Sequence, residues 1–326
     1  MSFEELGLHA QEIYEMAVEK YLRDEHMIYQ HDGMFYPPTD PMSGTPMMTE
    51  EVLRKTVWDT EMKFNEIHSL FNDFLVLPDP ADFDGPIQSL TTCMDALCSQ
   101  AFTDPIQGDP HPVNVELRAM TVAGTTLDEW DGLAAKAFMN NFVIPFEDRT
   151  ENQFTSASIL MNALNANMEL WTRARANIDD IAHKVKSALD HYDDCGKNEW
   201  EIGLSVVGAV VAIASVPVTG GASAVALGAV ASAVDVASTF AGQIEDPPKK
   251  DYSAESVEGV IDKAKQGIND LKAEVERAEQ KIVDAMTNTS GVVAAHTSDF
   301  LAPRPTLAGH RGEPPNDPDV GRPDDD

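Results

Sequence analysis

Histidines, cysteines and paired acidic residues are the side chains of this chain that could perform catalysis or bind a metal ion. The nine histidines are scattered, and none has a His-Glu-x-x-His or similar metal-binding spacing. His26, His31 and Asp32 fall at the end of a predicted helix, where exposure to water accounts for them. Asp179-Asp180 and Asp193-Asp194 similarly fit solvated faces on or after a helix. We therefore predict no metal site and no cofactor.

Motifs for common enzyme reactions are also absent from the sequence. It contains no G-x-S-x-G elbow, no P-loop and no dinucleotide fingerprint. Cys93, Cys98 and Cys195 are too few for a disulfide framework and lack a zinc-binding spacing. A Cys93–Cys98 disulfide is compatible with an exported chain, but two partly buried free thiols are the simpler expectation. No catalytic residue is assigned, and we expect a protein that is not an enzyme.

Composition limits the partners of the chain. Its 326 residues, 43% of them hydrophobic, suffice for a core and for two or three domains. With 23 basic against 55 acidic residues, the net charge is −32, which argues against nucleic acid and against docking on anionic lipid. A cationic or apolar partner, or another copy of the chain, fits this charge better.

Helical periodicity dominates the first part of the chain. Apolar residues from Phe3 to about Gln30 lie on one helical face, and Gly33 with the prolines of residues 36–41 ends that helix. Thr49 and two glutamates open a second helix. Its predicted apolar face consists of Val52, Leu53, Val57, Trp58, Met62, Ile67, Leu70, Phe71 and Phe74. These two helices are expected to form an antiparallel hairpin.

Two long heptad patterns organise the rest of the chain. After a linker at Pro78–Pro86, short helices are predicted near residues 90–102 and 113–123. A stripe from Phe154 to Tyr192 follows, broken only by Arg175, and another runs from Val257 to Ala285. Alternating steps of three and four residues are typical of long helices in a left-handed coiled coil, so we expect these two to pack antiparallel.

Between the long helices lies an apolar segment, residues 203–242, with Asp235 as its only charge. Val216 and Pro217 followed by Gly220-Gly221 mark a turn, so a hairpin of two apolar helices is expected. Its small residues would allow close packing in a membrane, but Asp235 is costly in lipid. A core hairpin and a surface covered by self-association are the alternatives.

The segment around Trp130 has the residues of a bend that opens a helix. Its pattern, W-x-G-x-A-A-x-x-F, comprises Trp130, Gly132, Ala134, Ala135 and Phe138. Glycine allows a tight backbone, the indole covers a helix junction, and the alanines permit close packing. An ordinary helix-helix corner would use the same residues. With the long helix that follows, the pattern resembles the WXG family of type VII (ESX) secretion substrates.

The resemblance implies export by a type VII system of the kind found in actinobacteria. Such substrates pair the W-x-G turn with a Tyr-x-x-x-Asp/Glu signal, for which the chain offers Tyr21…Glu25 and Tyr36…Asp40. Neither follows the second hairpin helix as is usual, although PE/PPE-like substrates carry this motif on an N-terminal hairpin. The implied role is a non-enzymatic virulence or interbacterial effector. Its implied partner is the secretion machinery, through an ATPase or chaperone.

These patterns together predict an all-α protein, an elongated helical bundle with a disordered acidic, proline-rich tail. We expect an N-terminal helical hairpin region at 1–105 and the W-x-G helical hairpin at 106–200. The apolar hairpin at 201–245, a long helix at 246–300 and the tail at 301–326 follow.

The N-terminus lacks the features of a Sec signal peptide, which fits a secreted or cell-surface protein that uses another route. Self-association is expected, and a membrane is a further candidate partner through residues 203–242. A helical pore-forming toxin of the cytolysin A type shares the order helix, apolar hairpin, helix. An intracellular helical scaffold is the remaining alternative.

Overall fold

The computed structural model shows a mainly α-helical protein and describes residues 3–126, 132–191, 201–202, 250–251, 254 and 256–301. The chain divides into two compact units. The first comprises Met1–Asp79, Glu169–Gly208 and Ile244–Ala278; the second comprises Pro80–Met168, Ala209–Gln243 and Glu279–Asp326. Two long helices, α7 (Phe146–Asp190) and α9 (Val257–Ala295), contribute one end to each unit.

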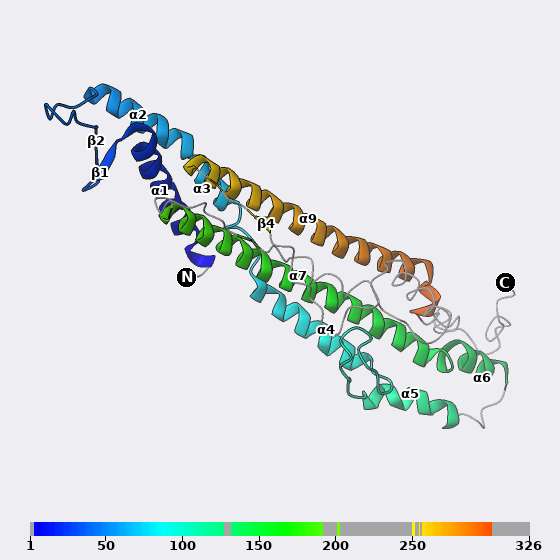
Figure 1. Cartoon of the computed structure of the whole chain (residues 1–326). Coiled ribbons are helices and arrows are strands. Elements are labelled where there is room, and N and C mark those ends of the chain that lie inside the picture. Colours follow the sequence, from blue (N-terminus) through cyan, green and yellow to red (C-terminus); the bar gives the residue numbers. More distant parts are fainter. Residues whose placement is uncertain are drawn as a thin grey trace, which may run out of the picture. The chain divides into compact units, whose positions relative to one another are not determined.

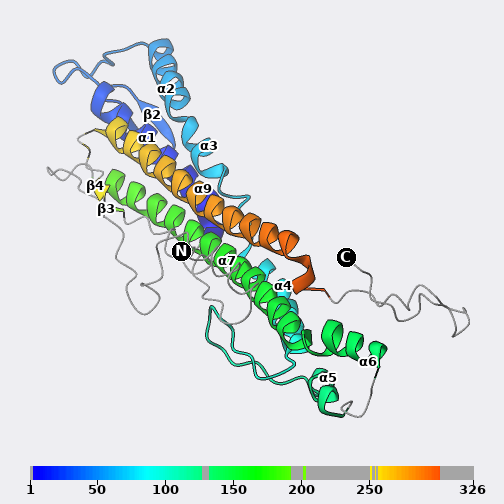
Figure 2. The same cartoon turned by 90° about the vertical axis from the view of Figure 1, so that its right-hand side faces the viewer.

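The first unit collects helices that are distant in sequence. It holds a 3-10 turn (Phe3–Glu5), α1 (Leu6–His26), β1 (Tyr29–His31), β2 (Met34–Tyr36), α2 (Glu50–Phe64) and α3 (Glu66–Asn72). Helix α1 packs against α2 and α3. Figures 1 and 2 both show these helices beside the C-terminal end of α7 and the N-terminal end of α9, which run in opposite directions.

Helix α1 ends in a β-hairpin that the sequence analysis did not predict. Met27 adopts a left-handed conformation that closes the helix, and β1 then pairs antiparallel with β2. The turn between them is Asp32-Gly33, with φ of 50° and 75°. An Asp-Gly pair with positive φ at both positions is typical of a tight hairpin turn, so the local signal for the hairpin was present in the sequence.

The second predicted helix consists of two helices and buries less than expected. The Thr49 side chain accepts a hydrogen bond from the Val52 backbone N–H (3.3 Å) at the start of α2, as predicted, but α2 and α3 are separate on either side of Asn65. The prediction of one continuous apolar face is wrong, because Val52, Trp58 and Met62 are at least half exposed. Only the end of α2 and helix α3 turn large apolar residues inward.

The two long helices carry the apolar stripes that the heptad patterns predicted. In α9 the buried apolar positions are Val257, Val260, Ile261, Ala264, Ile268, Leu271, Val275, Ala278 and Ile282. Helix α7 is buried over a wider face, since Leu170, Ala174 and Ile181 are buried beside the predicted Ile178, Ala182 and Val185. A helix with so wide an apolar face has to be covered from more than one side.

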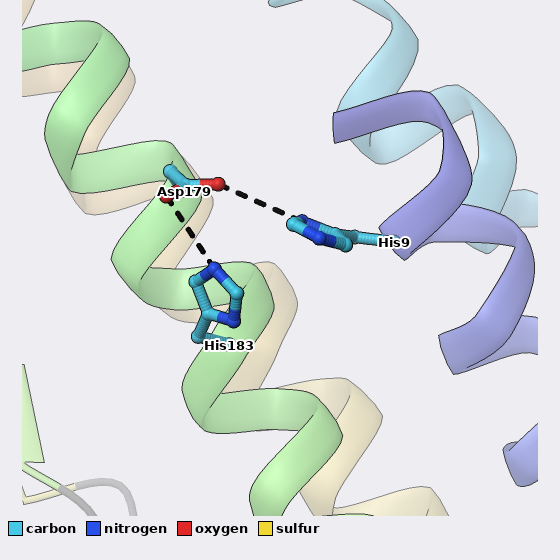
Figure 3. A group of neighbouring side chains, drawn as sticks. All are labelled: His9, Asp179 and His183. Carbon is cyan, nitrogen blue, oxygen red and sulfur yellow. Dashed lines mark ion pairs between the residues drawn. The ribbon is translucent and has the colours of Figure 1, made fainter. Parts of the chain in front are cut away.

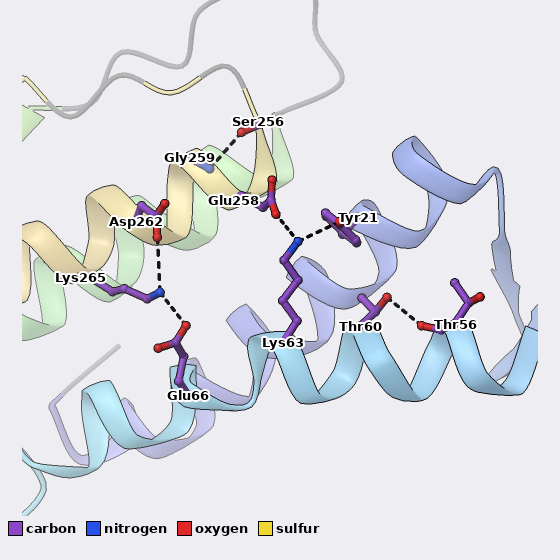
Figure 4. Close-up of polar contacts among 10 residues, drawn as sticks. All are labelled: Tyr21, Thr56, Thr60, Lys63, Glu66, Ser256, Glu258, Gly259, Asp262 and Lys265. Carbon is purple, nitrogen blue, oxygen red and sulfur yellow. Dashed lines mark hydrogen bonds and ion pairs between the residues drawn. The ribbon is translucent and has the colours of Figure 1, made fainter.

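Polar contacts fix the register between helices in the first unit (Figure 4). Glu258, Lys265 and Lys272 of α9, spaced seven residues apart, pair with Lys63, Glu66 and Asp73. On α1, Glu12 pairs with Lys186 of α7 (2.6 Å), and Lys20 donates to the Asp190 carbonyl (3.1 Å). Residue numbers increase together in both sets, so α9 runs parallel to α2 and α3, and α1 runs parallel to α7.

Arg175, the residue that breaks the heptad stripe, is half-buried in the first unit. Its guanidinium donates to the Leu77 carbonyl (3.1 Å), lies 3.6 Å from Asp79, and stacks 4.7 Å from the centre of the Phe3 ring. A cation at a core-facing position therefore connects α7 to both ends of the N-terminal segment.

The second unit contains shorter helices and a separate core. A 3-10 turn (Pro80–Phe83), α4 (Asp84–Leu97), α5 (Val115–Thr126) and α6 (Leu133–Phe138) lead into a π-helical turn (Met139–Val143) and α7. Helix α4 begins earlier than predicted, because Pro86 falls in its first turn, where proline is tolerated. Met94, Cys98, Phe102, Phe154 and Met161 form the core.

Gly132 does not lead into one continuous long helix. Helix α6 is six residues long, and the π-helical turn and Pro145 separate it from α7. Proline cannot donate a backbone hydrogen bond and clashes with the preceding turn, so the long helix starts just after it.

A loop of the pattern T-D-P-x-x-G-x-P occurs once in each unit, at residues 39–46 and 103–110. In both copies the first Thr bridges to the last Pro, and the Gly N–H donates to the Asp carbonyl. Gly44 and Gly108 have φ of 67° and 79°, which favours glycine. The copies differ in burial, since Asp104 is 1% exposed whereas Asp40 is only partly buried. The sequence analysis missed this repeat.

Asp104 should contribute more to the stability of the fold than Asp40 does. Its Oδ1 accepts hydrogen bonds from the backbone N–H groups of Ile106 (2.7 Å) and Gln107 (3.0 Å) and from the Ser158 hydroxyl (2.9 Å). Asp104→Ala would leave these donors unsatisfied, so we expect a loss of about 1–3 kcal/mol of unfolding free energy. Urea denaturation measures this loss, and Asp40→Ala is the matched control with a smaller effect. Equal losses for the two variants would contradict this burial argument.

Candidate functional site

The W-x-G segment is described from Gly132 onward, and Trp130 and the side chain of Ala134 lie outside the described residues. Gly132 directly precedes α6 with φ of 111°, and no atom of the described residues lies within 4 Å of where a Cβ would stand. Backbone conformation, not crowding, therefore favours glycine there. Ala135 is buried, and Phe138 stacks on Phe142 with ring centres 5.3 Å apart.

Tyr21 is held by contacts within the first unit (Figure 4). Its hydroxyl accepts a hydrogen bond from Lys63 Nζ (2.8 Å), which also lies 4.1 Å from the ring centre, and the ring meets Phe64 edge-on. Burial opposes the charge of Lys63, but its hydrogen bonds to Glu258 and Tyr21 outweigh this and raise the pKa of Lys63. Glu25 is exposed near the end of α1. Tyr21 thus has a structural role of its own.

Tyr36 and Asp40 occupy an exposed strand and loop. Tyr36 ends β2 opposite Tyr29 and is 45% exposed. Asp40 belongs to the first T-D-P loop, where the backbone N–H of Met42 and the hydroxyl of Ser43 lower the pKa of its carboxyl group. Other large hydrophobic residues at least half exposed in this part of the chain are Met27, Tyr29, Met34, Met42, Met47, Val52, Trp58 and Met62.

The residues predicted for the apolar hairpin, Val216, Pro217, Gly220, Gly221 and Asp235, all lie outside the described residues, as does the predicted tail. The strands that flank this segment are described: β3 (Glu201–Ile202) pairs antiparallel with β4 (Lys250–Asp251). The chain therefore leaves and re-enters the first unit at adjacent points. No helix of the described residues has the length and apolar character needed to cross a membrane.

Cys93 and Cys98 are both free thiols in different surroundings, and Cys195 lies outside the described residues. Cys93 is exposed on α4, whereas Cys98 is fully buried and its Sγ lies 3.2 Å from the Met94 carbonyl. Burial, together with the nearby charge of Asp95, raises the pKa of the Cys98 thiol to about 11. Two free thiols were expected, but only Cys98 is buried.

His9, Asp179 and His183 form a cluster between α1 and α7 that the sequence analysis did not predict (Figure 3). His9 Nδ1 lies 3.6 Å from Asp179 Oδ1, and His183 Nε2 lies 3.5 Å from Asp179 Oδ2. The two imidazole rings are tilted at 60° with their centres 4.6 Å apart. Figure 3 shows the Asp179 carboxylate facing both rings, with one ion pair to each.

The cluster is mostly removed from solvent. His9 is 2% exposed, and the side chains of Asp179 and His183 are 18% and 33% exposed. His9 Nδ1 and Asp179 Oδ1 are buried and make no hydrogen bond among the described residues. Buried polar atoms usually have partners, so these two require an explanation.

A pair of opposite charges borders the cluster. Glu12 follows His9 by one turn of α1, Lys186 follows His183 by one turn of α7, and their charged atoms lie 2.6 Å apart. The hydrogen bond and positive charge of Lys186 outweigh the effect of burial and lower the pKa of the Glu12 carboxyl group. The Glu12–Lys186 pair leaves Asp179 as the cluster's unbalanced negative charge.

Asp179 corrects one sequence expectation. It does not lie on a solvated face, because α1 covers it and brings His9 to its carboxylate. The spacing of Asp179 and His183, four residues on one helix, was a readable signal for two side chains on one face. His9 gave no such signal, since 170 residues separate it from Asp179. His31 and Asp32, which were expected to be exposed to water, form an exposed pair with 3.0 Å between His31 Nδ1 and Asp32 Oδ2.

No family model matches this chain, and comparisons with curated proteins and with solved structures find no match.

The two described thiols should differ strongly in reactivity. Alkylation requires the thiolate and access to the sulfur, so iodoacetamide should modify Cys93 readily. Cys98 should stay unmodified while the protein is folded. Peptide mass spectrometry measures both sites, and alkylation in concentrated urea is the control in which both should react. Comparable rates at both sites in the folded protein would show that Cys98 is accessible.

Proposed function

We propose that this chain is a non-enzymatic protein exported by a type VII secretion system. The observation that carries the proposal is Gly132, which opens α6 with φ of 111° within a W-x-G-x-A-A-x-x-F sequence. A positive φ explains why glycine is required in this motif. Buried Ala135 agrees with the close helix packing expected after such a turn. The proposed location of the protein is outside the cell or at the cell surface.

The proposed architecture is a helical bundle in which α5 and α6 flank the W-x-G turn and residues 203–242 form an apolar helical hairpin. The parallel and antiparallel helix contacts of the first unit support the bundle. Pairing of β3 with β4 supports a hairpin, because it joins the two ends of the apolar segment. We further propose that this segment mediates self-association and conditional membrane contact, since its composition is strongly apolar.

Tyr36 is the better candidate for the export tyrosine. An export signal has to be accessible to a secretion ATPase or chaperone, and Tyr36 is 45% exposed among other exposed hydrophobic residues. Tyr21 instead binds Lys63 and packs on Phe64. Exposed aromatic and methionine side chains are typical of protein-recognition surfaces, which supports a protein partner at the β1–β2 hairpin.

Trp130 and Gly132 should both be required for export. We expect Trp130→Ala and Gly132→Val to reduce the amount of protein in the culture supernatant of a strain with a working type VII system. At Gly132 the strained conformation should also cost about 1–3 kcal/mol. Matched controls are Leu8→Ala, which removes an exposed large hydrophobic residue of α1, and Gly85→Val, where no positive φ opposes a side chain and no described atom lies close.

Immunoblots of supernatant and cells, with a strain lacking the type VII ATPase, provide the readout. If both W-x-G variants are exported as well as the controls, or if export does not depend on the ATPase, the proposed function is wrong.

The two tyrosine motifs can be separated by their expected effects. Tyr36→Ala should abolish export while leaving the melting temperature nearly unchanged, because the side chain is exposed. Tyr21→Phe keeps the aromatic packing and removes only the hydroxyl that binds Lys63, so it should lower stability slightly and leave export intact. Supernatant immunoblots and thermal unfolding followed by circular dichroism measure these effects. If Tyr36→Ala is exported normally and Tyr21→Phe is not exported, the export signal belongs to Tyr21.

A further inference from the structure

We propose that His9, Asp179 and His183 bind a divalent transition-metal ion of the zinc class, which links α1 to α7. The site is independent of the proposed secretion function. It rests on three ligand residues of two types, on their separations, and on the lack of other partners for the buried atoms among the described residues (Figure 3).

The distances suit a shared ion better than direct hydrogen bonds. Ligand atoms about 2.0–2.1 Å from a tetrahedral zinc ion are about 3.3 Å from each other. His9 and His183 lie 3.6 Å and 3.5 Å from the Asp179 carboxylate, and one ligand atom from each residue lies within 4.8 Å of the others. Small side-chain rotations would bring all three to a common ion, whereas 3.6 Å is too long for a hydrogen bond.

The unpartnered atoms are the ones that an ion would satisfy. His9 is 2% exposed, and its Nδ1 has no hydrogen-bond partner among the described residues. Asp179 Oδ1 lies 3.6 Å from His9 Nδ1 and is likewise buried without a hydrogen-bond partner among the described residues. Leaving a buried donor or acceptor without a partner is unfavourable. A metal ion bound to His9 Nδ1 and Asp179 removes both deficits together.

The ligand set determines the class of metal. Neutral imidazole offers one nitrogen lone pair, here from Nδ1 of His9 and Nε2 of His183, and leaves the proton on the other nitrogen. Two imidazoles and a carboxylate favour zinc and neighbouring transition metals, whereas Mg²⁺ and Ca²⁺ prefer oxygen ligands. His183 and Asp179 are partly exposed, so water can complete the coordination.

The surroundings favour a cation at this point. Asp179 contributes a negative charge, while the charges of Glu12 and Lys186 are paired with each other. The net charge of the chain, −32, also attracts cations. Binding would cross-link residue 9 to residues 179 and 183, so the ion should stabilise the first unit.

Isothermal titration of the metal-free, full-length chain with Zn²⁺ tests this site. The parent should bind one Zn²⁺ tightly, and Mg²⁺ should produce no comparable binding. His183→Gln and Asp179→Asn remove ligands from partly exposed positions and should each weaken binding by at least the roughly 10–100-fold expected for disturbing a metal site. His31→Gln is the matched control, because His31 also lies beside an aspartate but has no third ligand within the part of the chain that the structure describes.

Two further measurements keep the test independent of variant folding. Circular dichroism should show the same helicity for parent and variants, and Zn²⁺ should raise the melting temperature of the parent and the control only. In the parent and the His31→Gln control, but not in the two ligand variants, Co²⁺ should produce the visible absorption bands of a low-symmetry nitrogen- and oxygen-liganded site. The proposal is overturned if the parent does not bind Zn²⁺, if His31→Gln weakens binding as much as His183→Gln, or if the Co²⁺ spectrum shows only the hydrated ion.

Discussion

Removal of two long apolar stripes from water is the constraint on which this structure depends. The stripe of α9 is almost fully buried from Val257 to Ile282, and α7 buries an even wider face. Each buried Leu or Ile side chain contributes about 1.5–3 kcal/mol, far more than an exposed ion pair at about 0–1 kcal/mol. Apolar burial therefore supplies the stability, and the short helices are arranged to cover it.

Charged residues beside the stripes determine which helices meet and in what register. Glu258, Lys265 and Lys272 occupy equivalent positions of successive heptads and each finds an opposite charge on α2, α3 or the residue that follows. A shift of one helical turn would separate all of these pairs at once. Flanking charges in coiled coils set partner and orientation in this way, even where each pair contributes little energy.

The interface of α1 with α7 differs from these apolar contacts because it contains buried polar groups. His9 and Asp179 are held close together by the packing around them, yet no hydrogen bond joins them. The two T-D-P loops also show that the surroundings of a polar side chain decide its role. Asp104 is buried with three donors to its Oδ1, whereas the corresponding residue of the first loop, Asp40, is only partly buried. Identical local sequence thus acquires different importance from its surroundings.

The sequence by itself determined the features that depend on neighbouring residues. Heptad spacing located α7 and α9, Thr49 marked the start of α2, and the glycine requirement at residue 132 followed from its motif. The Asp32-Gly33 turn and the repeated T-D-P loop were also readable, since local hydrogen bonds and positive φ values define them.

Only the tertiary structure decided which side chains were covered and which distant residues met. The sequence analysis placed Val52, Trp58 and Ile67 on one apolar face, but only Ile67, on α3 beside α1, is buried, and Val52 and Trp58 are exposed on α2. The same limit applies to Asp179, whose acidic neighbour suggested a solvated surface until α1 placed His9 against it. The spacing of apolar residues predicts the helix that contains them. Burial and ligand geometry depend on the helix that packs against it, which the local sequence does not specify.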